Sequence, residues 1–145
     1  MNKRHGDVLL EPAKAIPKGA KKLDPSVCRC QAFEPCAKHF IFAHGEVSGH
    51  VHQAVVEREG DTPAIEFYMM DGGDFYAKNV SDAPAHLVQS KGLARAADIA
   101  HLERCYKAEG LHAPIKDAIA PGQVVKVDFP QEYNWWSGEI ERARD

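Results

Sequence analysis

Short apolar runs, separated by glycine, proline and charged residues, make up most of the chain. They are rich in β-branched and aromatic residues, as β-strands are. The runs cover residues 7–10, 39–44, 50–59, 64–70, 74–80, 84–89 and 123–129. Gly72 and Gly73 separate two of them and predict a hairpin turn, because glycine adopts positive φ without strain. The pattern therefore predicts about seven short strands.

One stretch has a different period. In GLARAADIAHLERCYKAEG the apolar residues recur at helical spacing, which predicts an inserted helix over residues 91–109 that stops at Gly110. The residues from Ser137 onward predict a short C-terminal helix. Together these elements predict one β-rich domain over residues 1–145, a small antiparallel β-barrel or sandwich with one inserted α-helix.

Composition restricts the classes of partner. The chain has 44% hydrophobic and 27% charged residues with a net charge of −3, which is ordinary for a globular protein and gives no basic surface for nucleic acid. No apolar run approaches the roughly 18–20 residues that cross a bilayer. The first residues lack a long apolar segment of the signal-peptide kind. We therefore expect a cytoplasmic protein with no membrane or nucleic-acid partner.

Four potential metal ligands lie within twelve residues, in a cysteine-rich loop over residues 28–39. They are Cys28, Cys30, Cys36 and His39. Thiolates combined with an imidazole form closed tetrahedral zinc sites, so the spacing makes this loop a structural zinc candidate. Two alternatives remain. The cysteines could be reduced and simply buried, or Cys36 could be a nucleophile paired with His39 or His44.

Two histidines lie one residue apart in the stretch HGEVSGHVHQAVVE, which spans residues 44–57. Alternate residues of a strand share a face, so His50 and His52 project together. Two neighbouring imidazoles form half of a site for zinc, iron, manganese or nickel. The alternative is that both histidines are tolerated on a polar strand face.

This stretch resembles the first conserved motif of the cupins. The residues that carry the resemblance are Gly45, His50, His52, Glu57 and Gly60. In cupins the two histidines and the glutamate bind a metal ion inside a small β-barrel. The resemblance thus implies a cupin-like barrel and adds Glu57 to the candidate ligands.

A second resemblance covers most of the chain in outline. It is carried by the GDVLL strand at residues 6–10, Ile16-Pro17, the GEVSGHVH string at 45–52, His112 ahead of Pro121-Gly122, and the Gln131–Tyr133 segment. In these segments the chain is similar to a small family met in phages and bacterial mobile elements. The resemblance implies a phage or mobile-element protein that acts in the host cytoplasm. It also implies that His112 joins the histidine pair. His86 or Glu57 would then supply a fourth ligand.

Two functional hypotheses follow. In the first, the protein binds a divalent metal ion, most readily zinc, with iron, manganese or nickel as alternatives; the sequence leaves open whether it is an enzyme. In the second, it is a non-enzymatic accessory protein that contacts a host protein or a second copy of itself, and the histidine motif is structural. The chain contains no phosphate-binding or dinucleotide-binding motif, which argues against nucleotide chemistry.

Overall fold

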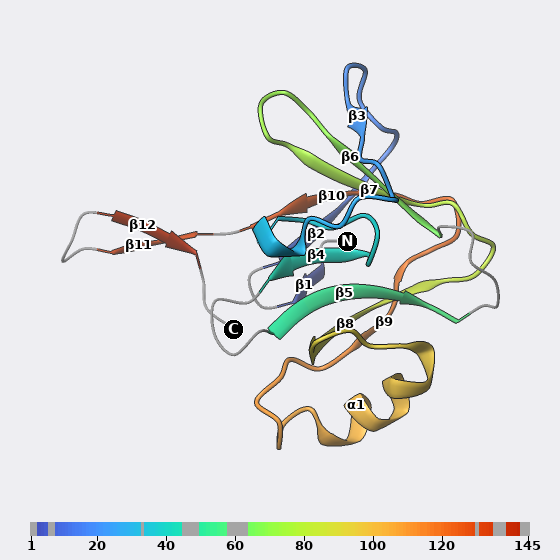
Figure 1. Ribbon diagram of the computed structural model, residues 1–145, viewed down its shortest axis with the longest axis vertical. Coiled ribbons are helices and arrows are strands. Elements are labelled where there is room, and N and C mark those ends of the chain that lie inside the picture. The colour runs from blue at the N-terminus through green and yellow to red at the C-terminus, as the bar shows by residue number, and fades with distance from the viewer. Residues whose placement is uncertain are drawn as a thin grey trace.

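The strands of the protein form two antiparallel sheets that face each other, and a separate hairpin extends to one side (Figure 1). This computed structural model describes residues 3–5, 8–32, 34–44, 50–57, 64–129, 131–134 and 139–142. The first sheet, sheet A, contains in spatial order β1 (Lys3–His5), β2 (Val8–Ala13), β10 (Val124–Asp128), β7 (Phe75–Asn79), β6 (Ile65–Met69) and β3 (Lys21–Lys22). The second, sheet B, contains β4 (Ile41–His44), β5 (His50–Val56), β8 (Ala85–Lys91) and β9 (Ile115–Ile119).

The mainly β prediction is confirmed, and the architecture is a sandwich. Within the described residues no strand of sheet A pairs with a strand of sheet B, so the closed, cupin-like barrel is not what these strands form. The predicted hairpin around Gly73 is present, with φ of 93° at that glycine. Strands β1, β3 and β9 were not predicted, because two of them are very short and β9 is half polar.

Aromatic rings join the two sheets at the centre of the sandwich. Phe42 of sheet B stacks on Phe67 of sheet A with ring centroids 5.2 Å apart, and Phe67 meets Phe75 edge-on at 5.1 Å. All three side chains are buried. A bulge between Ile41 and Ala43 turns Phe42 into this core and leaves Ile41 on the outer face of sheet B.

The inserted helix lies where it was predicted, but it is shorter. A 3-10 turn, η2 (Ala96–Asp98), leads into α1 (Ile99–Cys105), and Asp98 accepts a hydrogen bond from the backbone N–H of Arg95 at 2.8 Å. The apolar residues of this segment pack on the outer face of sheet B against Val55 and Val88. Sheet B therefore lies between sheet A and the helix (Figure 1). Its two central strands are consequently buried on both faces.

The predicted short C-terminal helix is wrong. Residues Glu139–Arg142 form strand β12, which pairs antiparallel with β11 (Gln131–Asn134). The sequence Glu-Ile-Glu-Arg contains a single apolar residue, so its pattern fits a strand as well as the start of a helix. Pairing with β11 selects the strand.

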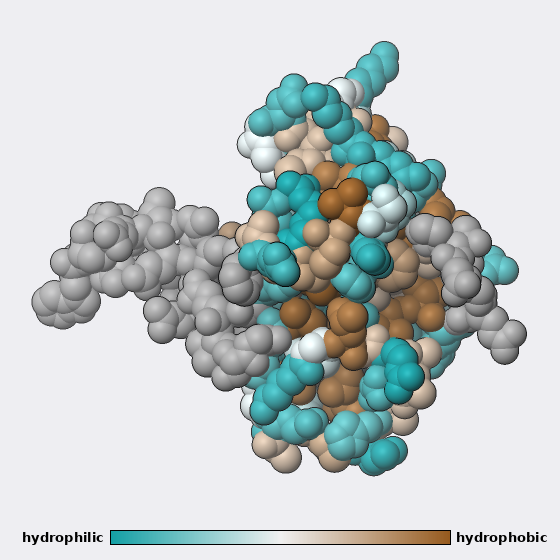
Figure 2. Space-filling model, in the orientation of Figure 1, coloured by the Kyte–Doolittle hydropathy of each residue, from teal (hydrophilic) through white to brown (hydrophobic). Residues whose placement is uncertain are grey.

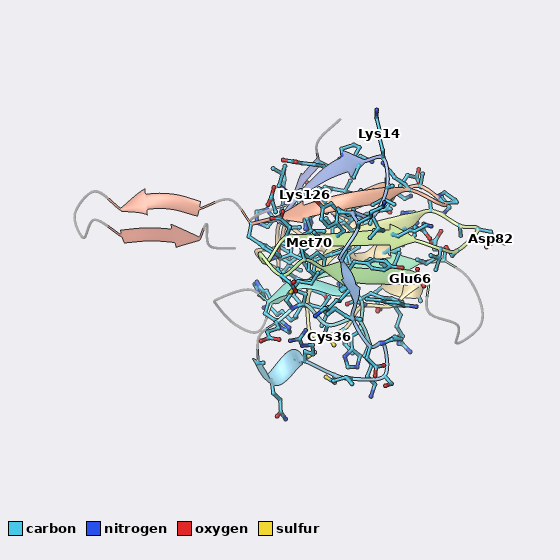
Figure 3. All side chains as sticks on the ribbon, turned by 90° about the horizontal axis from the view of Figure 1, so that it is seen from above. Lys14, Cys36, Glu66, Met70, Asp82 and Lys126 are labelled. Carbon is cyan, nitrogen blue, oxygen red and sulfur yellow. The ribbon has the colours of Figure 1, made fainter. Side chains whose placement is uncertain are left out.

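An ion pair holds the short strand β3 against β6, and it predicts a pH effect. Lys22 Nζ lies 2.7 Å from Glu66 Oε2, and this contact lowers the pKa of Glu66. The position of Glu66 is labelled in Figure 3. The resulting stability is present above the ordinary glutamate pKa of about 4.3 and is lost as the pH falls through the lower folded pKa. We expect Glu66→Gln to lower the free energy of unfolding by roughly 0.5 kcal/mol at neutral pH and to have no effect at pH about 3.

Urea unfolding of both proteins at the two pH values measures this difference. Asp71→Asn is a suitable control, because Asp71 faces Lys21 at 3.8 Å with both side chains exposed and should contribute nothing measurable. An equal loss for Glu66→Gln at both pH values would contradict the electrostatic explanation.

Candidate metal centre

The loop between β3 and β4 brings together the four ligands predicted from the cysteine spacing. The ligand atoms of Cys28, Cys30, Cys36 and His39 all lie within 4.8 Å of one another. The Nδ1 atom of His39 lies 3.7 Å from the sulphur of Cys28, 3.6 Å from that of Cys30 and 3.4 Å from that of Cys36. The four residues therefore form a possible metal site.

These distances suit a tetrahedral zinc ion. Zinc lies about 2.3 Å from a thiolate sulphur and about 2.0–2.1 Å from an imidazole nitrogen. At tetrahedral angles, a sulphur and a nitrogen bound to the same ion are therefore roughly 3.5–3.6 Å apart. The three sulphur–nitrogen distances in this loop, 3.4–3.7 Å, bracket that value.

A tight turn positions two of the ligands. The backbone N–H of Cys36 donates to the carbonyl of Ile41 at 2.9 Å, and the N–H of Ile41 donates back at 3.0 Å. Phe40 has a φ of 55°, a left-handed conformation that lets the chain turn into β4. The turn folds the chain back on itself, so His39 lies beside Cys36 rather than pointing away from it.

The other two ligands lie on either side of Arg29, where the 3-10 turn η1 (Cys30–Ala32) begins. The backbone N–H of Arg29 donates to Cys36 Sγ at 3.4 Å, the kind of contact that stabilises a thiolate. The Arg29 guanidinium pairs with the Glu34 carboxylate. His44 Nε2 lies 3.1 Å from the Glu34 carbonyl oxygen, which ties the loop to β4.

The thiols differ in their electrostatic surroundings. The backbone N–H of Cys30, followed by its side chain, lowers the pKa of the exposed Cys28 thiol. Burial raises the pKa of Cys30 to about 12, and hydrogen bonds from Cys28 and then Cys36 add to the shift. A divalent cation would stabilise the thiolate form of all three cysteines.

The loop also packs against the outer face of sheet B. Cys36, Ile41 and Val51 form a small buried cluster, with Cys30 half-buried at its side. Figure 3 shows Cys36 beyond the strands, near the short cyan helical turn. Apolar residues are also visible in the middle of the face that carries β5 (Figure 2). Because Cys36 is fully buried, its sulphur is inaccessible to a substrate, which argues against the nucleophile alternative.

The histidine motif lies on the opposite, inner face of sheet B. His52 is fully buried there, and its Nδ1 lies 2.7 Å from Nδ1 of His5 on β1. The ring of His112 lies 5.6 Å from that of His5 and 6.1 Å from that of His52, between centroids. The sequence did not single out His5, because Lys-Arg-His near the start of the chain looks like a solvated segment.

His50 lies on the same face of β5 as His52 by strand alternation. The side chain is buried, and neither ring nitrogen has a hydrogen-bond partner within the part of the chain that the structure describes. Gln89, directly opposite His52 in the sheet, accepts the backbone N–H of His112 at 2.6 Å, while its own amide nitrogen is unpaired. Gly45 and Gly49, the two glycines of the motif, lie outside the described residues.

His86 and Glu57, the two candidates for a fourth ligand, are placed elsewhere. His86 lies opposite Val55, on the outer face of the sheet, so its ring points away from His52. Its Nδ1 accepts the backbone N–H of Asp117 at 3.0 Å, at a bulge where Asp117 has φ of 55°. Nε2 lies 3.6 Å from a carboxylate oxygen of Glu57. In this structure the pair supports the bulge and does not join the inner histidines.

No family model, curated protein or solved structure matches the chain. Among the described residues, no helix combines the length and apolar character that spanning a membrane requires.

Proposed function

We propose that the protein is a zinc-binding β-sandwich protein, in which one ion is held by Cys28, Cys30, Cys36 and His39. The observation that supports this most directly is the set of sulphur–nitrogen distances of 3.4–3.7 Å, which match those around a tetrahedral zinc ion. Four protein ligands leave no open coordination position, so the ion is structural rather than catalytic.

The ion would stabilise a loop that has little core of its own. Residues 23–40 connect β3 of sheet A with β4 of sheet B, and among the described residues of this loop the regular structure is limited to η1, turns and one isolated bridge at Cys36. Bound zinc fixes Cys36 against Ile41 and Val51 and so covers the outer face of sheet B at β4. The role of the ion is then to complete the sandwich beside the edge strand.

Thiol labelling tests this proposal sharply, because Cys28 is exposed and its pKa is lowered. An exposed thiol of this kind reacts rapidly with a disulfide reagent when it is free. In Cys105→Ser protein, which removes the remaining cysteine, we expect zinc to slow labelling at least about tenfold and a chelator to restore the fast rate.

The matched comparison is Cys36→Ser in the same Cys105→Ser background. That variant retains the exposed Cys28 but lacks one ligand, so zinc should protect it far less. Fast labelling of the parent protein at every zinc concentration, with a melting temperature insensitive to chelator, would reject the zinc site. It would favour the alternative of a metal-independent accessory protein.

A further inference from the structure

A group of buried histidines lies on the inner face of sheet B, apart from the cysteine site. Within β5 the side chains alternate, so Val51 packs beneath the cysteine loop while His50 and His52 point to the other side of the sheet. His5 reaches this face from β1, and His112 reaches it from the segment that leads into β9. Three separate parts of the chain therefore meet at one point.

Burying this many imidazoles needs compensation. The exposed fraction is 0% for His52, 2% for His5 and 7% for His50. A buried polar group without a hydrogen-bond partner costs about 1–3 kcal/mol, so such groups usually have one. Among the described residues, His50 has none at either ring nitrogen, and the amide nitrogen of Gln89 on the neighbouring strand also has none. A water molecule or an ion bound on this face would supply the missing partners.

The spacing of the rings suits a metal ion. With nitrogens about 2.0–2.1 Å from an ion, the centroids of two bound imidazoles are roughly 4.5–5.3 Å apart, depending on the angle between them. The His5–His52 distance of 4.8 Å falls in this range. The distances from His112, 5.6 and 6.1 Å, exceed it by less than about 1 Å, which a side-chain rotation of this half-buried residue can close.

The contact between His5 and His52 also suits a metal site. Their Nδ1 atoms, 2.7 Å apart, share one proton in a hydrogen bond. Two nitrogens on one ion are roughly 3.0–3.3 Å apart, so replacing the shared proton by an ion separates them by only about half an ångström. Gln89 holds the backbone of His112 at 2.6 Å and acts as a positioning residue for the third ring.

We infer that His5, His52 and His112 bind a second divalent first-row transition-metal ion, with His50 as a further imidazole on the same face. Imidazole ligands select zinc, iron, nickel or cobalt over magnesium and calcium. Three protein ligands leave coordination positions open to water or to an oxygen atom of a small molecule, in contrast to the closed cysteine site. The two sites lie on opposite faces of sheet B and do not depend on each other.

Titration of the metal-free, full-length protein with Co²⁺ tests this inference. Thiolate-to-cobalt charge-transfer absorption reports the cysteine site, and the total bound cobalt reports both. We expect two ions per wild-type chain. His52→Gln and His112→Gln should each bind one, with the second affinity reduced more than about a hundredfold and the charge-transfer absorption retained. Retained absorption also shows that the variant is folded around the cysteine loop.

His86→Gln is the matched control, because it removes a buried histidine of the adjacent strand β8 that faces the other side of the sheet. It should still bind two ions. Cys36→Ser should bind one ion without charge-transfer absorption. One ion per wild-type chain would overturn the inference, and so would wild-type affinity for two ions in His112→Gln. If His52→Gln fails to fold, His112→Gln still tests the inference, because His112 is half-buried on a loop.

Discussion

A tenfold increase in free zinc should raise the free energy of unfolding by about 1.4 kcal/mol for each zinc ion that binds only the folded chain. The four ligands of the cysteine loop converge only when the turn at residues 36–41 and η1 are formed. The unfolded chain therefore binds the ion more weakly. At a free zinc concentration about a thousand times the Kd, the ion contributes about 4 kcal/mol, a large part of the stability of a domain of this size.

Denaturant unfolding in zinc buffers of graded free concentration measures this slope. The cysteine site is isolated by comparing wild type with Cys36→Ser, whose slope should be smaller by about 1.4 kcal/mol per decade. Cys105→Ser should keep the wild-type slope, because Cys105 lies on α1, away from the four ligands. Equal slopes for wild type and Cys36→Ser would show that the loop contributes no zinc-dependent stability.

Phe67→Ala should lower the free energy of unfolding by about 3–5 kcal/mol. Phe67 is fully buried and contacts Phe42 of the facing sheet as well as Phe75 of the neighbouring strand. Truncation leaves a cavity between the sheets, and the strands on either side are fixed by their own hydrogen bonds, so they cannot close it. Urea unfolding measures the loss.

Two further variants show whether the cavity is the cause. Phe67→Leu keeps most of the buried volume and should cost less than half as much as Phe67→Ala. Leu93→Ala removes a large apolar side chain that is 55% exposed, and it should change the free energy of unfolding by no more than about 0.5 kcal/mol. A similar loss for Leu93→Ala and Phe67→Ala would contradict the cavity explanation.

The cysteine site was predictable because its ligands are local. Twelve residues contain all four, so a single loop can bring them together whatever the rest of the fold is. The histidine site is different. His112 and His5 reach His52 only through the pairing of β1 with β2 and the path of the chain between β8 and β9. No spacing in the sequence encodes those contacts, and His5 therefore went unnoticed.

Strand alternation predicted some of the remaining placements and missed others. It placed His50 and His52 on one face, as the structure has them. It could not show that His86 belongs to the other face, because that depends on its register opposite Val55. It also could not show that β5 and β8 are buried on both faces, since α1 and the cysteine loop cover the outer one. The C-terminal helix was wrongly predicted because a segment with one apolar residue fits the period of a strand as well as that of a helix.

Strand β10 lies in the interior of sheet A, hydrogen-bonded to β2 on one side and to β7 on the other. The residues of β1, β2, β6 and β7 are all synthesised well before residues 124–128. Until then the two hairpins have no strand between them, and each exposes an unpaired edge that can join another chain. The growing chain is therefore prone to aggregate until β10, a strand of five residues, has been synthesised and pairs with both β2 and β7.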